Sequence, residues 1–218
     1  MKRVEPFLLV FLLILIPVVA IAQSGPGIGR VEFVDGDVRI NGELATFGHE
    51  VGLGDWVETG PNSTIEIVFD RGNIFELGPN TVAKLDLGEA RQQVDLKFGT
   101  LSAVFERVRT LSGRGTFDVR TSTAVAGVRG TTFFLRVIDG ETTYVCTCNG
   151  SLELMPGNGN PFVETAAEHS AYFFRENESG EVDVESAEDL YHDNASLNSL
   201  ADRIGAAIPW GQLPDDAE

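Results

Sequence analysis

Turn-forming residue pairs divide this chain into many short segments between residue 29 and about residue 155. Asp-Gly, Asn-Gly and Arg-Gly pairs begin at Asp35, Asn41, Arg71, Asp139 and Asn149. These pairs accept the positive φ that tight hairpin turns require. On both sides of such a pair, as in VEFVDGDVRI at 31–40, apolar and polar residues alternate, which gives a strand one buried and one solvated face. The pattern predicts an all-β fold: a twisted β-sandwich or β-roll of many short strands.

A short internal repeat adds to this prediction. Gly60-Pro61-Asn62 is followed by Ser63 and a strand-like segment, and Gly78-Pro79-Asn80 is followed by Thr81 and another. Repeated turns of this kind favour a roll or sandwich with similar corners at one end, although two matching turns in a simple meander would look the same.

Three longer runs resemble a known family. They are VGLGDWVETGPNSTIEIVFDRGNIFELGPNT at 51–81, LKFGTLSAVF at 96–105 and FDVRTSTAVAGVRGTTFFLRV at 117–137. In this order they resemble the FecR domain, the periplasmic module of bacterial sensor proteins that relay the state of an outer-membrane receptor. The resemblance implies an all-β domain over residues 29–155 and, by analogy only, a signalling role.

Individual residues in these runs have predicted structural tasks. Asp55 and Thr59 are short polar side chains that can brace a turn by accepting bonds from backbone N–H groups. Trp56 and Phe69 are expected to fill the core, and Gly72 is expected to supply the positive φ of a hairpin.

The N-terminus, MKRVEPFLLVFLLILIPVVAIAQSG, predicts export. Two basic residues, an apolar stretch and a small-x-small site make residues 1–22 a signal peptide cleaved before Gln23, with 23–28 a linker. The alternative is an uncleaved N-terminal anchor, which would be the only membrane contact. In either case we expect a periplasmic or secreted protein. Few residues precede the apolar stretch, so we expect no cytoplasmic anti-sigma segment.

The chemistry of the chain argues against several functions. Its formal net charge is −17, which should repel nucleic acid and anionic lipid. It contains no G-x-S-x-G elbow, no P-loop and no H-E-x-x-H sequence, so we expect no enzyme. The predicted function is a non-catalytic binding or signalling module of the cell envelope, whose partner is another envelope protein or a cell-wall glycan.

The two cysteines raise a separate possibility. Cys146 and Cys148 are two residues apart in TYVCTCNG, ahead of a predicted turn at Asn149-Gly150. Alternating strand geometry puts both thiols on one face, at the upper limit for a disulfide.

Three interpretations of these thiols stay open. They are small core residues, or a thiol-redox pair or intermolecular bridge, or two ligands of a metal site. In the third, His169 and His192 complete a Cys2His2 set suited to zinc, the only cofactor we consider.

Residues 156–218 are expected to form an extension of different character. Segments around 163–169 and 170–176 predict a strand pair, and an amphipathic helix and an acidic tail follow. Ser186 with Asp189 resembles a capping box. One continuous helix from that cap would put His192 on the wrong face for the metal site, whereas a break near Asp193 would free it.

Overall fold

The computed structural model describes residues 29–69, 72–88, 92–106 and 117–213. The predicted signal peptide, the linker and the last five residues of the acidic tail lie outside these ranges. The described residues form fifteen strands and one helix, which confirms the all-β prediction. The elements are β1 (Gly29–Asp35), β2 (Val38–Ile40), β3 (Glu43–Leu44), β4 (Glu50–Val51), β5 (Leu53–Thr59), β6 (Thr64–Phe69), β7 (Asn73–Leu77), β8 (Val82–Leu87), β9 (Gln92–Phe105), β10 (Phe117–Arg120), β11 (Ala124–Val137), β12 (Thr142–Pro156), β13 (Phe162–Ala166), β14 (Ser170–Glu176), β15 (Val182–Ala187) and α1 (Asn194–Arg203).

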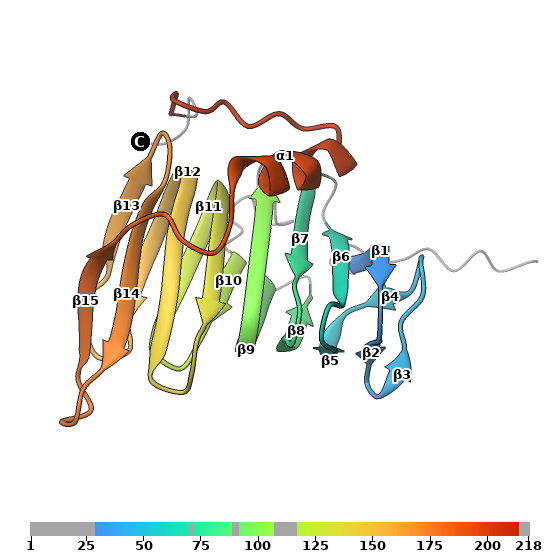
Figure 1. Ribbon diagram of the computed structural model, residues 1–218, viewed down its shortest axis with the longest axis horizontal. Coiled ribbons are helices and arrows are strands. Elements are labelled where there is room, and N and C mark those ends of the chain that lie inside the picture. Colours follow the sequence, from blue (N-terminus) through green and yellow to red (C-terminus); the bar gives the residue numbers. More distant parts are fainter. Residues whose placement is uncertain (1–28, 70–71, 89–91, 107–116, 214–218) are drawn as a thin grey trace, which may run out of the picture.

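The strands form two layers, which share three long strands (Figure 1). The front layer runs in the order β4, β1, β6, β7, β9, β11, β12, β14, β15, and uses the second half of β9 and β11 and the first half of β12. The back layer runs β3, β2, β5, β8, β9, β10, β11, β12, β13, and uses the other halves of the same three strands. All neighbours are antiparallel except β9 and β10.

Each long strand changes layer at a glycine with positive φ. In β9, pairing with β8 ends at Phe98 and pairing with β11 begins at Gly99, whose φ is 91°. Gly130 (φ 121°) and Gly150 (φ 113°) occupy the same place in β11 and β12. Only glycine adopts such angles readily, and it is the usual residue at a bulge or a sheet corner. These three residues therefore let one strand serve both layers.

Gly150 also overturns one prediction. Asn149-Gly150 is not a hairpin turn, because β12 continues through it to Pro156. The positive φ that makes Asn-Gly a turn signal is used here for a bend within the strand, and Asn149 itself is buried.

The two Gly-Pro-Asn repeats form stacked corners that carry the chain between the layers. The first leads from β5 in the back layer to β6 in the front, and the second returns from β7 to β8. Asn62 and Asn80 have almost the same positive φ, 55° and 53°. The hydroxyl of Thr59 joins the corners, since it donates to the Gly78 carbonyl (2.6 Å) and accepts from the Thr81 N–H (2.8 Å). The predicted corners and the bracing role of Thr59 are confirmed.

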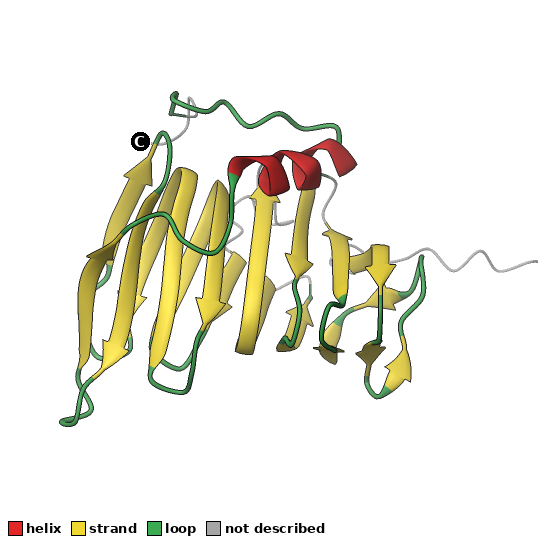
Figure 2. Cartoon of the chain, viewed as in Figure 1, coloured by secondary structure: helices red, strands yellow, loops and turns green. Residues whose placement is uncertain are grey.

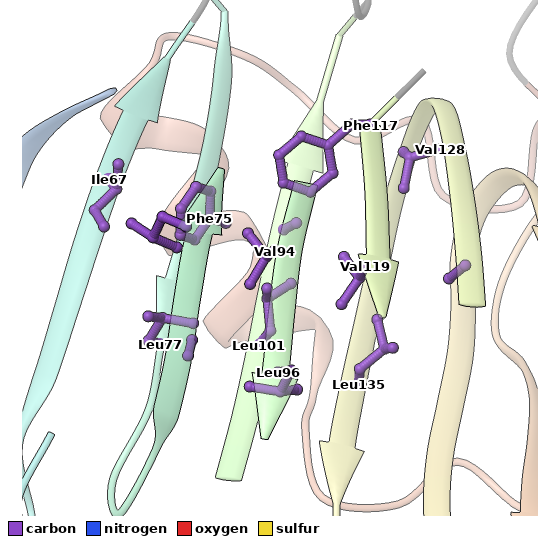
Figure 3. Packing of buried hydrophobic residues seen from close by; sticks show 14 of the residues in the cluster. Ile67, Phe75, Leu77, Val94, Leu96, Leu101, Phe117, Val119, Val128 and Leu135 are labelled. Atoms are coloured by element: carbon purple, nitrogen blue, oxygen red, sulfur yellow. The ribbon is translucent and has the colours of Figure 1, made fainter. Parts of the chain in front are cut away.

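The main core fills the space between the layers (Figure 3). Phe69 is buried there as predicted, beside Phe75, Phe105 and Phe117. The prediction for Trp56 was wrong, because its side chain is 39% exposed. Its neighbour on β5, Val57, is fully buried, and successive side chains of a strand point to opposite faces.

Strands β13 and β14 form where a strand pair was expected, but each bonds to β12 and not to the other. After β15 the chain leaves the sheet and crosses the outer surface of the front layer; we call residues 188–213 the strap (Figure 2). Its helix α1 packs on β7 and β9. Within the ranges given above, no helix is both long and apolar enough to cross a membrane.

Of the two helix starts left open by the sequence, the structure has the second. Asp193 is the N-cap of α1, and its carboxylate accepts the Ser196 N–H at 2.8 Å in a capping box. Leu197, Leu200 and Ala201 are the buried residues of the helix. The residues before Asp193 are therefore not constrained to one helical face, and His192 is free to point elsewhere.

Candidate metal centre

Strand β12 places both thiols beneath the strap. Cys146 and Cys148 are fully buried in an apolar cluster with Phe134, Tyr144 and Leu197. A β-bulge occurs here, because Thr132 and Phe133 on β11 pair with Asn149 and Thr147, which leaves Cys148 as the extra residue. The two Sγ atoms lie 3.7 Å apart, and both cysteines are free.

His169 comes from the turn between β13 and β14. It adopts a left-handed φ of 38°, and its backbone N–H donates to the Cys148 carbonyl at 3.0 Å. Its Nδ1 lies 3.5 Å from the Cys146 Sγ. Its Nε2 lies 2.5 Å from the Asn194 Oδ1, and its ring stacks on Trp210 with centroids 5.4 Å apart. The ring is thus held on three sides with Nδ1 directed at the thiols.

His192 comes from the strap, immediately before the N-cap of α1. Its Nε2 lies 3.2 Å from the Cys148 Sγ, and its Nδ1 lies 2.8 Å from the Leu190 carbonyl. The ring stacks on Phe134, with an interplanar angle of 5° and centroids 4.5 Å apart. The strap therefore supplies one side chain to a cluster whose other members belong to the sheet.

The separations between neighbouring ligand atoms of the four side chains match those of a tetrahedral zinc site. One ligand atom from each of Cys146, Cys148, His169 and His192 can be chosen so that all lie within 4.8 Å of one another. With zinc–sulfur bonds of about 2.3 Å and zinc–nitrogen bonds of about 2.0–2.1 Å, two sulfurs are separated by about 3.8 Å and a sulfur and a nitrogen by about 3.5 Å. The measured separations are 3.7 Å between the sulfurs, and 3.5 and 3.2 Å between sulfur and nitrogen.

The outer nitrogens of both imidazoles are also occupied. Asn194 holds one ring and the Leu190 carbonyl holds the other. Partners of this kind select the tautomer and fix the ring of a metal-binding histidine. The two histidines therefore have the supporting hydrogen-bond partners that are usual for metal-binding histidines in proteins.

The thiols and imidazoles shift one another's proton affinity. A hydrogen bond from Cys148, then bonds from the two histidines, lower the pKa of Cys146 to about 4. Burial raises the pKa of Cys148. The bond to Cys146 raises the pKa of His169 to about 9; burial opposes a rise at His192, but interactions with Cys146 outweigh it and raise that pKa too. These interactions favour the thiolate form of Cys146, and a metal ion would displace the remaining protons.

Comparison with known proteins places part of this centre in a family. The model of the FecR family, described as FecR protein, matches residues 55–153. Those residues are a FecR domain. Cys146 and Cys148 lie inside the FecR domain, whereas His169 and His192 lie after its matched residues. The ligand cluster thus joins the FecR domain to the chain that follows it.

This chain was also compared with solved structures and with curated proteins. Two solved structures of a proposed anti-sigma factor from Parabacteroides distasonis ATCC 8503 are similar to this chain, each with 17% identity and a TM-score of 0.49. The similarity covers 61% of this chain and 60% of that protein. The search of curated proteins finds no match.

Other residues of the centre were not singled out by sequence reasoning. The Asn149 amide donates to the carbonyls of Ala167, Pro209 and Gln212, and so ties the end of the strap to β12. Trp210 stacks on the His169 ring. An Asn-Gly pair that interrupts a long apolar strand was the one available signal, and it was attributed to a turn.

Proposed function

We propose that this chain is a zinc-binding FecR-domain protein, in which a non-catalytic metal centre holds the strap against the sheet. The observation that carries the proposal is the grouping of one ligand atom each from Cys146, Cys148, His169 and His192, all within 4.8 Å of one another. Two thiolates and two imidazoles are a preferred donor set for structural zinc. Because His192 belongs to the strap, the ion would link the strap to β12 directly.

Burial of the site supports a non-catalytic role. A catalytic zinc keeps one position open for water or substrate, whereas a structural zinc has four protein ligands. Here four protein ligands are available, both cysteines are fully buried, and the histidine side chains are only 12% and 2% exposed. The zinc ion would stabilise one arrangement of the strap rather than activate a water molecule.

The place of action belongs to the same proposal. We place the protein in the cell envelope, as an exported binding or signalling module whose partner is an envelope protein or a cell-wall glycan. The FecR domain and the predicted signal peptide support this assignment. Cell fractionation tests it: the protein should appear in the periplasmic or secreted fraction, and a cytoplasmic location would contradict it.

The metal content of the purified protein tests the zinc proposal. Protein isolated without chelators should contain about one equivalent of zinc, and its thiols should react only after the metal is removed. The double variant Cys146→Ser/Cys148→Ser should contain none. His49→Ala is the matched control, because His49 precedes β4 at the far end of the front layer and should not affect zinc. A metal-free wild type, or zinc retained by the double variant, would overturn the proposal.

One observation favours a second candidate, thiol-redox exchange. The free sulfurs lie 3.7 Å apart, and the lowered pKa of Cys146 supplies a thiolate. A Cys146–Cys148 disulfide would be strained and readily reduced, since the Cα separation along a strand is at the limit for such a bond. If the protein is metal-free and forms this disulfide reversibly, the redox function replaces the zinc function.

A further inference from the structure

Asp189 lies at the solvent side of the metal centre. Its Oδ1 is 3.7 Å from the His169 Nδ1 and 3.5 Å from the His192 Nε2. These are the same ring nitrogens that face the two thiols. The Asp189 side chain is 40% exposed, in contrast to the buried cysteines and to the His192 side chain, which is 2% exposed. Its carboxylate therefore touches the cluster on one side and water on the other.

The backbone around Asp189 is fixed by the strand that carries the thiols. The hydroxyl of Tyr144 donates to the Glu188 carbonyl at 3.0 Å and accepts the Leu190 N–H at 2.9 Å. Tyr144 is fully buried on β12, two residues before Cys146. A single side chain thus bonds to both neighbours of Asp189, so the sheet and not the strap alone determines where this carboxylate lies.

We propose that Asp189 is the ligand through which zinc enters and leaves the centre. The inference rests on the proposed function and deepens it. The resting ligands stay Cys146, Cys148, His169 and His192, and the carboxylate binds the ion only during exchange. Such a centre exchanges its zinc ion with the surroundings. The fraction of molecules in which the metal holds the strap on the sheet would therefore follow the concentration of free zinc.

The exchange needs no electron transfer. A hydrated Zn²⁺ ion is attracted by the carboxylate, and an Asp189 oxygen replaces one bound water. The thiolates and imidazoles then replace the remaining waters, their protons leave to solvent, and the carboxylate dissociates from the ion. Release follows the same steps in reverse. Because one group serves both directions, its loss should slow uptake and release together and leave the equilibrium affinity unchanged.

Metal-exchange kinetics of the Asp189→Asn variant test this inference. Uptake of Zn²⁺ is followed by stopped flow against a chromophoric chelator, release is followed in excess chelator, and the equilibrium Kd is measured by competition. Uptake should fall on the order of tenfold, as expected when an attractive charge is removed from an entry path. Release should fall by the same factor, because it uses the same carboxylate in reverse, so Kd stays the same. The absorption spectrum of the Co²⁺-loaded variant should match wild type, because the resting ligands are the same.

Glu188→Gln is the matched control. It removes the same charge from an adjacent exposed side chain and leaves the main-chain bond to Tyr144 in place. The uptake and release rates of Glu188→Gln should stay close to wild type. If Glu188→Gln slowed exchange as much as Asp189→Asn does, net charge and not the position of Asp189 would control the rates, and the inference would be overturned. Unchanged rates in Asp189→Asn would overturn the inference, as would a weaker Kd caused by faster release alone. If wild type itself binds no zinc, the proposed function fails first, and that result is visible before any variant is compared.

Discussion

The core between the two layers and the interface beneath the strap are both buried, yet they are built from different chemistry. The core is a continuous cluster of apolar side chains, which the strands of both layers supply. The strap interface combines a few apolar contacts, such as Ile74 with Leu200, with the thiol–imidazole cluster and an ion pair between Arg203 and Glu66 (3.1 Å). The core is stabilised by removal of apolar surface from water. The strap interface depends on buried polar groups, each of which needs a bonding partner.

The largest expected effect comes from a cavity in the core. Phe117 lies with its ring centroid 4.8 Å from that of Phe105 and 5.1 Å from that of Phe69. Phe117→Ala should lower the free energy of unfolding by about 3–5 kcal/mol, measured by urea denaturation. The folded fraction should still bind zinc as wild type does. A loss of zinc affinity in that fraction would show that core and strap interface are not independent.

Zinc removal should act mainly on the strap and on the residues around the cluster, and much less on the core between the layers. A ligand present at about 1,000 times its Kd stabilises the form that binds it by about 4 kcal/mol. Hydrogen exchange with and without chelator should therefore show faster exchange in residues 188–213 and little change in the core strands β6 and β10. Equal loosening of both regions, or of neither, would contradict the contrast between them.

A turn substitution tests the layer structure without touching the strap. Gly72 immediately precedes β7 in the β6–β7 hairpin and has a φ of 109°. A Cβ there would lie 2.8 Å from the Glu106 Oε2. Gly72→Val should destabilise the protein by about 1 kcal/mol or more. Gly140→Ala is the control, because its Cβ would meet no atom within 4 Å. Identical melting curves for wild type and Gly72→Val would contradict this prediction.

A smaller effect is expected from the cap of the strap helix. Asp193→Ala removes the acceptor of the Ser196 N–H and should cost about 1 kcal/mol, confined to α1. Hydrogen exchange of α1 should report it, with the exposed Asp202→Ala as control. The zinc stoichiometry should stay unchanged, since Asp193 is not among the four proposed ligands.

The smallest effect is a pH dependence beneath α1. Burial raises the pKa of Glu66 above its ordinary 4.5; Arg203 opposes this and the facing Glu76 adds to it. A carboxyl whose folded pKa is raised contributes stability below its unfolded pKa and loses it as pH rises through the folded value. The stability of wild type relative to Glu66→Gln should therefore fall as pH rises from below 4.5 towards neutral. A difference that grows with pH would show that the ion pair dominates.

The sheet could be predicted from the sequence to a greater extent than the strap interface could. Local alternation predicted the strands, and turn chemistry predicted the stacked corners. The same alternation, applied fully to β5, would have put Trp56 outside, because Val57 is the inward residue. Asn149-Gly150 was misassigned because a glycine with positive φ serves equally in a hairpin turn and in a strand bend.

For the proposed metal centre, the sequence identified the four residues but could not show that they lie together. Cys146 and His169 are 23 residues apart, and Cys148 and His192 are 44 apart, with no spacing that specifies contact. Asp189 was seen only as part of a helix cap, because nothing local connects it with Tyr144.

The sequence by itself determined the all-β character, the corners and the inward faces of the strands, since those depend on interactions among residues a few positions apart. The tertiary structure alone decided that β12 bends at Gly150, that α1 begins at Asn194, and that the strap returns across the front layer. These features depend on contacts between distant segments. Such contacts are chosen by the packing of the whole sheet, and no local pattern records them.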